Sequence, residues 1–245
     1  MGKWQEVTYL GRKDWDEGLA TFDFDHPNPE FLAGQFVQVA LEDENGKLIP
    51  RAYSIGSAPG APLELYIVLV DGGALTPRLF RLKPGDKVQV ARKFAGHFTL
   101  EKVGPAENLW LAGTGTGLAP YISMIRNNAL WDHYQRIVVY HGVRYGAQLA
   151  YREELEALQK ERPGQFFYLP TVSREDVPGT LQGRITTTWS EAVERVGAPI
   201  TPESTRFMLC GNRAMLDDMI SQLGELGLKR ALRSKPGEIH SEVYF

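Results

Sequence analysis

The sequence contains a single cysteine, Cys210, among 245 residues. One cysteine cannot form a disulfide within the chain, and it cannot supply the thiolate ligands of an iron–sulfur cluster or of a four-cysteine zinc site. The five histidines show no metal-ligand spacing apart from the short pairing of His240 with Glu242. We therefore expect no bound metal.

Long apolar runs and an excess of one charge are also missing. The longest strongly apolar run, LYIVLV at 65–70, is far shorter than the about 20 residues that span a membrane, and the first residues, MGKWQEV, lack the apolar segment of a signal peptide. With 27 Lys and Arg against 30 Asp and Glu, the net charge is −3, which does not favour nucleic acid or an anionic membrane as a partner. We expect a cytoplasmic protein.

The first part of the chain has the sequence pattern of short antiparallel strands. Alternating or apolar runs at 36–41, 63–70 and 87–93 are separated by the turn-forming segments ENGK, SAPGAP, DGG and KPGD. Short strands at this spacing, with few helix signals between them, are typical of an antiparallel sandwich or barrel. We assign residues 1–101 to such a domain.

From residue 102 onward, short apolar strands alternate with amphipathic stretches of helical length. The expected strands are 108–113, 136–143, 165–172, 206–211 and 238–245, and the expected helical stretches are 121–130, 149–161, 185–196 and 214–226. Strand and helix in alternation predict a parallel sheet with helices on both faces, in an α/β, Rossmann-like domain. We assign residues 102–245 to this second domain.

A glycine-rich turn follows the first strand of the second domain. The segment GTGTGLAP at 113–120 leads into a helix that we expect to open at Pro120, since proline is favoured in a first helical turn. Free backbone amides and the positive end of a helix dipole suit a phosphate group. The glycines occur at every second position, so the spacing differs from G-x-G-x-x-G. A tight strand-to-helix turn without a ligand is the alternative.

Arginines follow the next strands at their carboxyl ends. A dinucleotide fold that binds NAD carries an acidic residue about 20 positions after the glycine turn, but here Arg144 stands in that place. Arg174 follows the third strand beside Ser173, and Arg184 comes soon after. Guanidinium groups at this edge favour a 2′-phosphate, hence NADPH over NADH, whereas each arginine alone could also be a solvated surface charge.

Two further stretches carry side chains suited to a ligand. In RAYSIGS at 51–57, Arg51 offers a fork of donors for phosphate and Tyr53 offers a flat ring, which together suit a ligand with a charged tail and an aromatic head. An edge strand with a solvated arginine is the alternative. Cys210 lies at the carboxyl end of another strand, where a nicotinamide would rest, although a small buried side chain is the commonest use of cysteine.

Seven motifs occur in a fixed order along the chain: RAYS at 51–54, GGALTPRL at 72–79, GTGTGLAP at 113–120, HGVR at 141–144, VSRE at 172–175, MLCGN at 208–212 and the chain end EVYF. Together they resemble the bacterial ferredoxin–NADP reductases, the flavodoxin/ferredoxin reductase branch of the FAD-binding family. The resemblance spans almost the whole chain. It implies that the first domain is an antiparallel barrel that binds FAD and that the second domain binds NADP(H).

The resemblance also implies roles for single residues. On the FAD side, Arg51 would pair with the pyrophosphate, Tyr53 would stack on the isoalloxazine, and Ser54 would lie within hydrogen-bond reach of flavin N5. The other residues matched to FAD are Ala52, Tyr66, Ala74, Leu75, Thr76 and Thr116. Those matched to NADP are Thr114, Arg144, Tyr145, Ser173, Arg174, Arg184, Gly211 and Asn212, with Cys210 near the nicotinamide.

The chain end completes the catalytic set that the resemblance implies, which is Ser54, Cys210, Glu242 and Tyr244. Glu242 matches a carboxylate near the active site, and Tyr244 matches an aromatic ring that covers the flavin. Phe245 extends one residue further and would contact either the FAD adenine or the nicotinamide site. A final strand with a frayed tail is the alternative for this segment.

The expected activity is hydride transfer from NADPH to flavin N5, followed by one-electron exchange with ferredoxin or flavodoxin, in a monomeric enzyme. The carrier would be a separate protein, because the chain lacks ligands for an iron–sulfur cluster of its own. An alternative within the same class is an NAD(P)H-dependent flavin reductase or the reductase component of an oxygenase. A nucleotide-binding regulatory module without turnover is a further alternative, and it would be colourless.

Overall fold

The structure is a computed structural model that describes residues 2–27, 29–232 and 234–244. Its contacts divide the chain into two compact units. The first unit comprises Met1–Thr99 together with Ala119–Asn127, and the second comprises Leu100–Leu118 together with Asn128–Phe245. Residues 119–127 thus group with the first unit, although the segments before and after them belong to the second.

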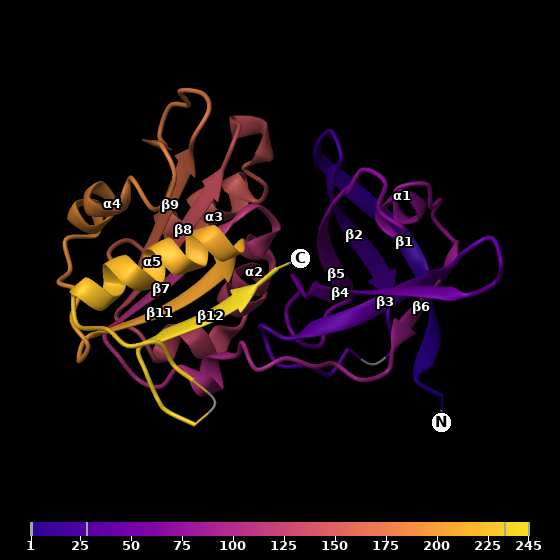
Figure 1. The fold of residues 1–245 in the computed structure, drawn as a ribbon, viewed down its shortest axis with the longest axis horizontal. Coiled ribbons are helices and arrows are strands. Elements are labelled where there is room, and N and C mark those ends of the chain that lie inside the picture. Colours follow the sequence, from indigo (N-terminus) through magenta and orange to yellow (C-terminus); the bar gives the residue numbers. More distant parts are fainter. Residues whose placement is uncertain (1, 28, 233, 245) are drawn as a thin grey trace. The chain divides into compact units, whose positions relative to one another are not determined.

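Six antiparallel strands build the first unit (Figure 1). They are β1 (Trp4–Asp16), β2 (Leu19–Asp25), β3 (Phe36–Glu42), β4 (Leu48–Ser54), β5 (Leu63–Val68) and β6 (Lys87–Ala91), in the order β4-β3-β6-β1-β2-β5. The two outermost strands meet at a bridge between Ile55 and Leu65, where the amide of Gly56 donates to the carbonyl of Glu64 at 2.8 Å. The sheet therefore closes on itself, which confirms the predicted antiparallel barrel.

The interior of the barrel is filled from alternate strand positions, as the pleat requires. Phe22, Phe24, Val37, Val39 and Leu65 are all fully buried in one hydrophobic cluster. The short helix α1 (Thr76–Leu79) contributes Leu79 to the same cluster. The apolar positions of β2, β3 and β5 therefore form much of this core.

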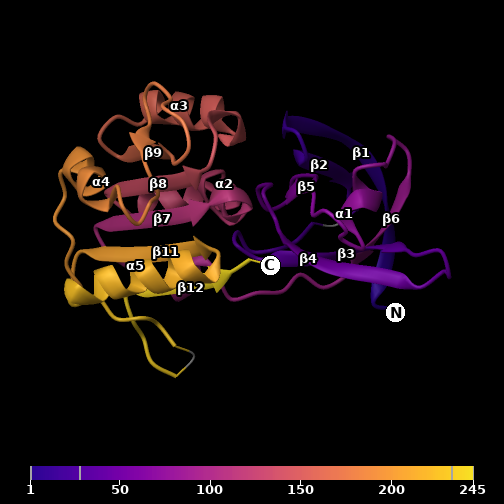
Figure 2. The same cartoon turned by 45° about the horizontal axis from the view of Figure 1, so that its top comes forward.

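The second unit contains a parallel six-stranded sheet. Its strands are β7 (Asn108–Thr114), β8 (Arg136–Val143), β9 (Phe166–Val172), β10 (Leu181–Gln182), β11 (Thr205–Gly211) and β12 (Ile239–Val243), in the order β10-β9-β8-β7-β11-β12 (Figure 2). From β7 the chain moves outward through β8, β9 and β10, and it then returns to the other side of β7 with β11 and β12. This arrangement confirms the predicted parallel sheet.

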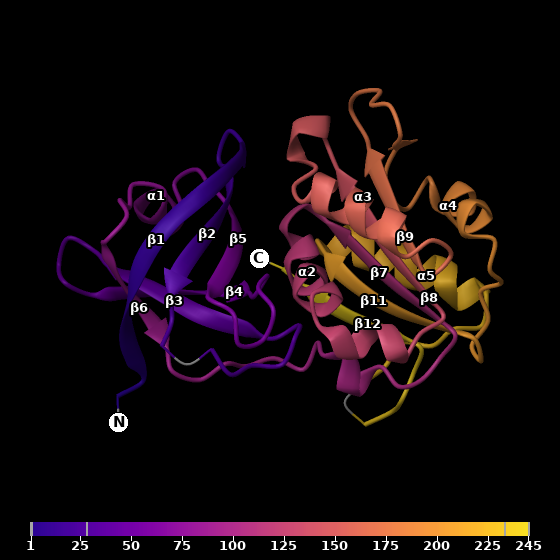
Figure 3. The ribbon, with the colours of Figure 1, turned by 180° about the vertical axis from the view of Figure 1, so that it is seen from behind.

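Helices cover both faces of this sheet. Helices α4 (Trp189–Val196) and α5 (Arg213–Glu225) pack on one face against Trp110, Tyr140 and Phe207. Figure 1 shows α5 crossing in front of the strands, and Figure 3 shows α3 (Arg152–Glu161) on the opposite face. None of the helices within the described residues is long and apolar enough to cross a membrane.

The segment after the glycine turn differs in detail from its prediction. Helix α2 (Ala119–Ile125) begins one residue before Pro120, and the stretch predicted as one helix over 121–130 is split between α2 and the 3₁₀ turn η3 (Asn128–Asp132). The remaining 3₁₀ turns are η1 (Leu100–Lys102), η2 (Gly115–Leu118) and η4 (Gly146–Gln148). All seven residues of α2 are buried.

Candidate functional site

The carboxyl ends of the parallel strands in the second unit form one edge of the sheet. Register pairs Gly113 of β7 with His141 of β8 on one side and with Cys210 of β11 on the other. The direction of strand addition reverses between β7 and β11, and ligands of open α/β sheets bind at such a reversal. The predicted residues Thr114 and Gly211 lie at this point.

The glycine turn packs directly against β11. Gly115 has φ +53°, a left-handed conformation that favours glycine. A Cβ on Gly117 would lie 2.5 Å from the carbonyl oxygen of Cys210, and one on Gly211 would lie 2.8 Å from Oγ1 of Thr114. Two glycines are therefore required by close packing and one by its backbone conformation, and together they bring the η2 backbone to the carboxyl edge.

His141 supports this turn from the neighbouring strand. Its side chain is fully buried, and its Nε2 lies 3.2 Å from the carbonyl oxygen of Gly115. Because a carbonyl only accepts, Nε2 carries the hydrogen and donates it. Burial lowers the pKa of His141 to about 4, so the ring is neutral at pH 7. The HGVR motif predicts no role for His141, because a lone histidine in a strand pattern gives no signal of its burial.

The predicted nucleotide residues after β8 and β9 lie together. The amide of Arg174 donates to the carbonyl of Arg144 at 3.0 Å, and the hydroxyl of Ser173 donates to the carbonyl of Val143 at 3.3 Å. Nη1 of Arg174 donates to the hydroxyl of Tyr145 at 3.3 Å, with the guanidinium carbon 5.8 Å from the centre of the tyrosine ring. Four predicted residues from two loops thus form one cluster.

Arg184 lies at the same edge of the sheet, because the preceding residue, Gly183, is hydrogen-bonded to the end of β9. The amide of Gly183 donates to the carbonyl of Val172 at the end of β9, at a distance of 2.8 Å. Arg144, Arg174 and Arg184 are exposed, and within the described part of the chain none of their guanidinium groups forms an ion pair. Exposed cations without acidic partners suit a phosphate ligand.

Two predicted residues at and just after the end of β11, Cys210 and Asn212, have different surroundings. Cys210 is 1% exposed, and burial together with the charge of Glu242 raises the pKa of its thiol, which stays protonated. Asn212 caps helix α5, because its Oδ1 accepts a hydrogen bond from the amide of Met215 at 3.0 Å. A nucleotide contact by Asn212 would therefore share this side chain with the helix cap.

The chain end returns to the same edge. Glu242 pairs with Cys210 in the β11–β12 register, and burial raises the pKa of its carboxyl to about 7. The hydroxyl of Tyr244 lies 3.4 Å from Oγ1 of Thr114, within hydrogen-bond range, and its amide donates to the carbonyl of Gly211 at 3.3 Å. The structure thus brings the predicted chain-end residues to the glycine turn. Phe245 lies outside the described residues.

In the first unit, the predicted flavin residues Arg51, Ala52, Tyr53 and Ser54 lie on β4. Arg51 is exposed, and its Nη1 donates only to the carbonyl of Pro50 at 2.8 Å within the residues that the structure describes. Tyr53 is half-buried against the barrel core, and burial raises its pKa to about 12. Its hydroxyl is shielded from solvent and has no hydrogen-bond partner among the described residues.

The other predicted FAD residues are more dispersed. Tyr66 is 3% exposed on β5, Leu75 is buried in the core, and Ala74 is exposed just before α1. The hydroxyl of Thr76 accepts from the amide of Val70 at 3.0 Å, so it serves the turn before α1. Thr116 lies in η2 and therefore belongs to the second unit, as does Tyr244.

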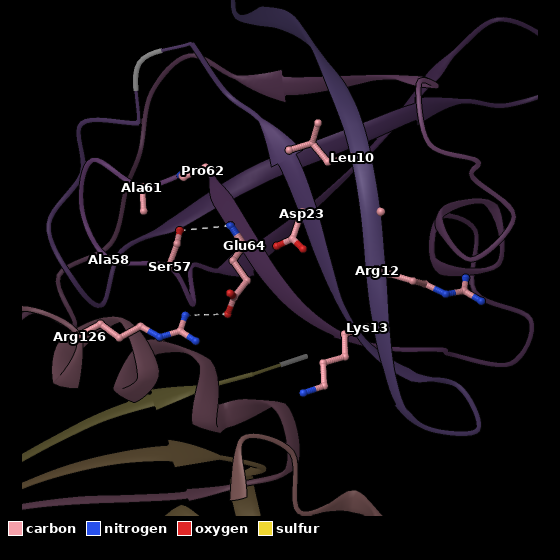
Figure 4. Close-up of a pocket in the computed structure, with 11 residues that line it drawn as sticks. Leu10, Arg12, Lys13, Asp23, Ser57, Ala58, Ala61, Pro62, Glu64 and Arg126 are labelled. Carbon is pink, nitrogen blue, oxygen red and sulfur yellow. Dashed lines mark hydrogen bonds and ion pairs between the residues drawn. The ribbon is translucent and has the colours of Figure 1, made fainter. Parts of the chain in front are cut away.

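An open pocket of about 710 Å³, with both apolar and charged side chains in its lining, lies in the first unit and was not predicted (Figure 4). It is lined by residues of β1 and β2, by the loop after β4, and by Glu64 and Arg126. Arg126 Nη1 lies 3.0 Å from Oε1 of Glu64. Asp23 faces Glu64 across the β2–β5 pairing, and burial, together with the charge of Glu64, raises the pKa of Asp23.

Comparison with known proteins identifies two domain families in the chain. The model of the oxidoreductase FAD-binding domain matches residues 12–98, and that of the oxidoreductase NAD-binding domain matches residues 111–220. The chain is 37% identical over 221 residues to the flavodoxin/ferredoxin–NADP reductase of Escherichia coli (strain K12), which covers 89% of each chain. It is also 37% identical to the ferredoxin–NADP reductase of Azotobacter vinelandii, covering 94% of this chain and 93% of the relative.

A solved structure gives the same result. The ferredoxin NADP⁺ reductase from Neisseria gonorrhoeae, determined with bound FAD and NADP, superposes with a TM-score of 0.93 at 29% identity over 100% of both chains. These matches confirm the resemblance inferred from the seven motifs, and they confirm the predicted FAD-binding and nucleotide-binding domains. By relatives that match it along most of its length, the chain belongs to the flavodoxin/ferredoxin–NADP reductase family of FAD-dependent oxidoreductases.

Proposed function

We propose that this protein exchanges electrons between NADP(H) and a flavodoxin or ferredoxin, using FAD held by β4 and NADP held at the carboxyl edge of the parallel sheet. The observation that carries the proposal is the set of three exposed arginines without acidic partners at the same carboxyl edge of the sheet as the glycine turn. Family membership and the FAD-binding domain support the flavin half of the assignment.

The residues on β4 fit FAD. Arg51 is an exposed guanidinium on a strand at the end of the sheet order, where a pyrophosphate can approach it. The hydroxyl of Tyr53 is buried without a partner among the described residues, a cost of about 1–3 kcal/mol that a polar ligand atom would remove. Its ring supplies a flat apolar surface for the isoalloxazine. Ser54, half-buried on the same strand, would hold a hydrogen bond at flavin N5.

The residues at the sheet edge fit NADP. The η2 turn presents backbone amides at the start of α2, and Thr114 lies beside it. Arg144, Arg174 and Arg184 would bind the 2′-phosphate, and Tyr145 is held next to them through its contact with Arg174. The acidic residue that would bind an unphosphorylated ribose is missing from this place, so we propose NADP(H) over NAD(H).

FAD, when bound, would supply the redox chemistry, which is acceptance of a hydride from NADPH and release of single electrons. The chain positions the reactants and adjusts protons. Glu242, with a pKa of about 7, can hold or release a proton near neutral pH. Cys210 contributes a neutral, apolar side chain at the strand end, and Tyr244 covers the adjoining surface through its contact with Thr114.

A spectrum and a reduction experiment test this function. The purified protein should be yellow, and anaerobic NADPH should bleach the flavin band much faster than NADH. Turnover with purified flavodoxin, ferredoxin and free flavin then identifies the acceptor. A colourless protein that cannot take up FAD would refute the proposal, and efficient turnover with free flavin alone would favour a flavin reductase. A monomeric state and a cytoplasmic location remain predictions from the sequence.

A further inference from the structure

Arg126 lies just beyond the end of α2, and its side chain points toward β5 (Figure 4). Its Nη1 donates to the carbonyl of Gly56 at 3.1 Å and to Oε1 of Glu64 at 3.0 Å. One nitrogen therefore makes both bonds, one through each of its two hydrogens. These bonds join segments that are 62 and 70 residues apart in sequence.

The backbone held by Arg126 is the turn that follows β4. The amide of Ile55 donates to the carbonyl of Gln35 at 3.1 Å, and the amide of Gly56 donates to the carbonyl of Glu64 at 2.8 Å. The carbonyl of Gly56 is the group that Arg126 binds. Ser54 precedes Gly56 by two residues, so Arg126 holds the backbone two residues after Ser54.

Charge makes this contact stronger than a neutral hydrogen bond would be. The Arg126 and Glu64 side chains are 26% and 18% exposed, so their ion pair is partly shielded from water. Asp23 lies opposite Glu64 in the β2–β5 register, and like charges directly opposite each other are unfavourable. Arg126 offsets this repulsion, because its charge lowers the pKa of Asp23 against the effect of burial. Removal of the guanidinium would leave two facing carboxylates and a freed carbonyl beside the turn.

We propose that Arg126 is a positioning residue for hydride transfer, which fixes Gly56 and thereby holds Ser54 in the orientation that binds flavin N5. This inference rests on the proposed function, because it takes Ser54 to contact the flavin. It gives the contact between Arg126 and Glu64 a role in the rate of flavin reduction. Arg126 itself contacts neither NADPH nor the flavin ring in this proposal, so the affinity for NADPH should be unaffected.

The test is anaerobic rapid-mixing reduction of FAD-loaded Arg126→Met and Arg126→Lys by NADPH, with the rate expressed per bound flavin. Arg126→Met should reduce its flavin about 10-fold more slowly at saturating NADPH, since small displacements of a reacting pair cost this much or more. Arg126→Lys should stay within about 2-fold of wild type, because one ammonium group can donate both bonds. Arg195→Met, which breaks an exposed ion pair with Glu191 on α4, is the matched control and should equal wild type.

A double-mutant cycle with Ser54→Ala separates positioning from general destabilisation. If Arg126 acts through Ser54, Arg126→Met should change the rate by less than about 2-fold in the Ser54→Ala background, because coupled residues are not additive. A further 10-fold loss there would overturn the proposal, as would a wild-type rate for Arg126→Met alone. If Arg126→Met does not retain FAD, a 10-fold loss in Arg126→Lys overturns it. Failure of NADPH to reduce the wild-type flavin would refute the proposed function instead.

Discussion

The raised pKa of Glu242 predicts a specific change in stability with pH when the charge is removed. Burial raises this pKa from 4.5 to about 7. Between these two values the folded protein therefore binds more protons than the unfolded chain. The protonated carboxyl contributes fully to the free energy of unfolding below pH 4.5, and this contribution is lost as the pH rises to about 7. The variant Glu242→Gln cannot ionise, so it should gain stability over wild type across this window.

The size of the effect follows from the width of the window. The gap between 4.5 and about 7, at 1.36 kcal/mol for each pH unit, gives about 3 kcal/mol as an upper value. Because Glu242 is half-buried and partly screened by solvent, we expect about 1–2 kcal/mol. The advantage of Glu242→Gln should be smallest near pH 4.5, rise through neutrality and remain constant above pH 8.

Thermal or urea unfolding of the FAD-loaded proteins at a series of pH values measures this difference. Other groups that titrate, His141 among them, are present in both proteins and cancel in the comparison. Glu194→Gln, which removes an exposed carboxylate from α4, controls for the change in net charge. An advantage of Glu242→Gln that is equal at pH 5 and pH 8 would refute the reasoning, because it would show that Glu242 does not titrate in this range.

Three further perturbations test the nucleotide edge. Arg144→Ala should weaken NADPH by roughly 10- to 100-fold and NADH far less, since a charged hydrogen bond contributes about 1.5–3 kcal/mol; equal losses in a binding titration would remove Arg144 from the 2′-phosphate site. His141→Asn should lose less stability than wild type between pH 6.5 and pH 4, because the buried ring has a pKa of about 4 and the unfolded chain takes up its proton first as pH falls; identical acid profiles in unfolding experiments would contradict this. Gly117→Ala should destabilise the fold by about 1–3 kcal/mol, because its Cβ would lie 2.5 Å from the carbonyl oxygen of Cys210. Gly224→Ala, in the last turn of α5 with open space around it, is the control and should be neutral or stabilising by up to about 1 kcal/mol.

The parallel sheet could be predicted closely because its strands are buried on both faces and read as apolar runs. Strand β8 begins and ends at the predicted residues, Arg136 and Val143. The barrel was predicted as a class, but β1 and β2 were not found. Strand β1 spans Trp4–Asp16 with a shift in register between Tyr9 and Gly11 and mostly polar outward positions. Its alternation is therefore interrupted, and no short apolar run marks it.

Some residues of the candidate site could likewise be predicted from the sequence, and others could not. The residues after strands, such as Thr114 and Arg174, could be found because parallel strands bring their carboxyl ends to one edge. The contact of Arg126 with Glu64 joins segments 62 residues apart, and no local sequence pattern indicates such a pair. The burial of His141 depends on which neighbours cover β8, and the sequence of one strand does not contain that information.

Strand β4 is paired much more extensively with one of its neighbours in the barrel than with the other. Along one side β4 is paired with β3 over its whole length, from Leu48 to Ser54, whereas on the other side the described residues show a single bridge, between Ile55 and Leu65. Between the two outermost strands, closure of the barrel therefore depends on this one bridge and on the hydrogen bond from the Gly56 amide to the Glu64 carbonyl beside it.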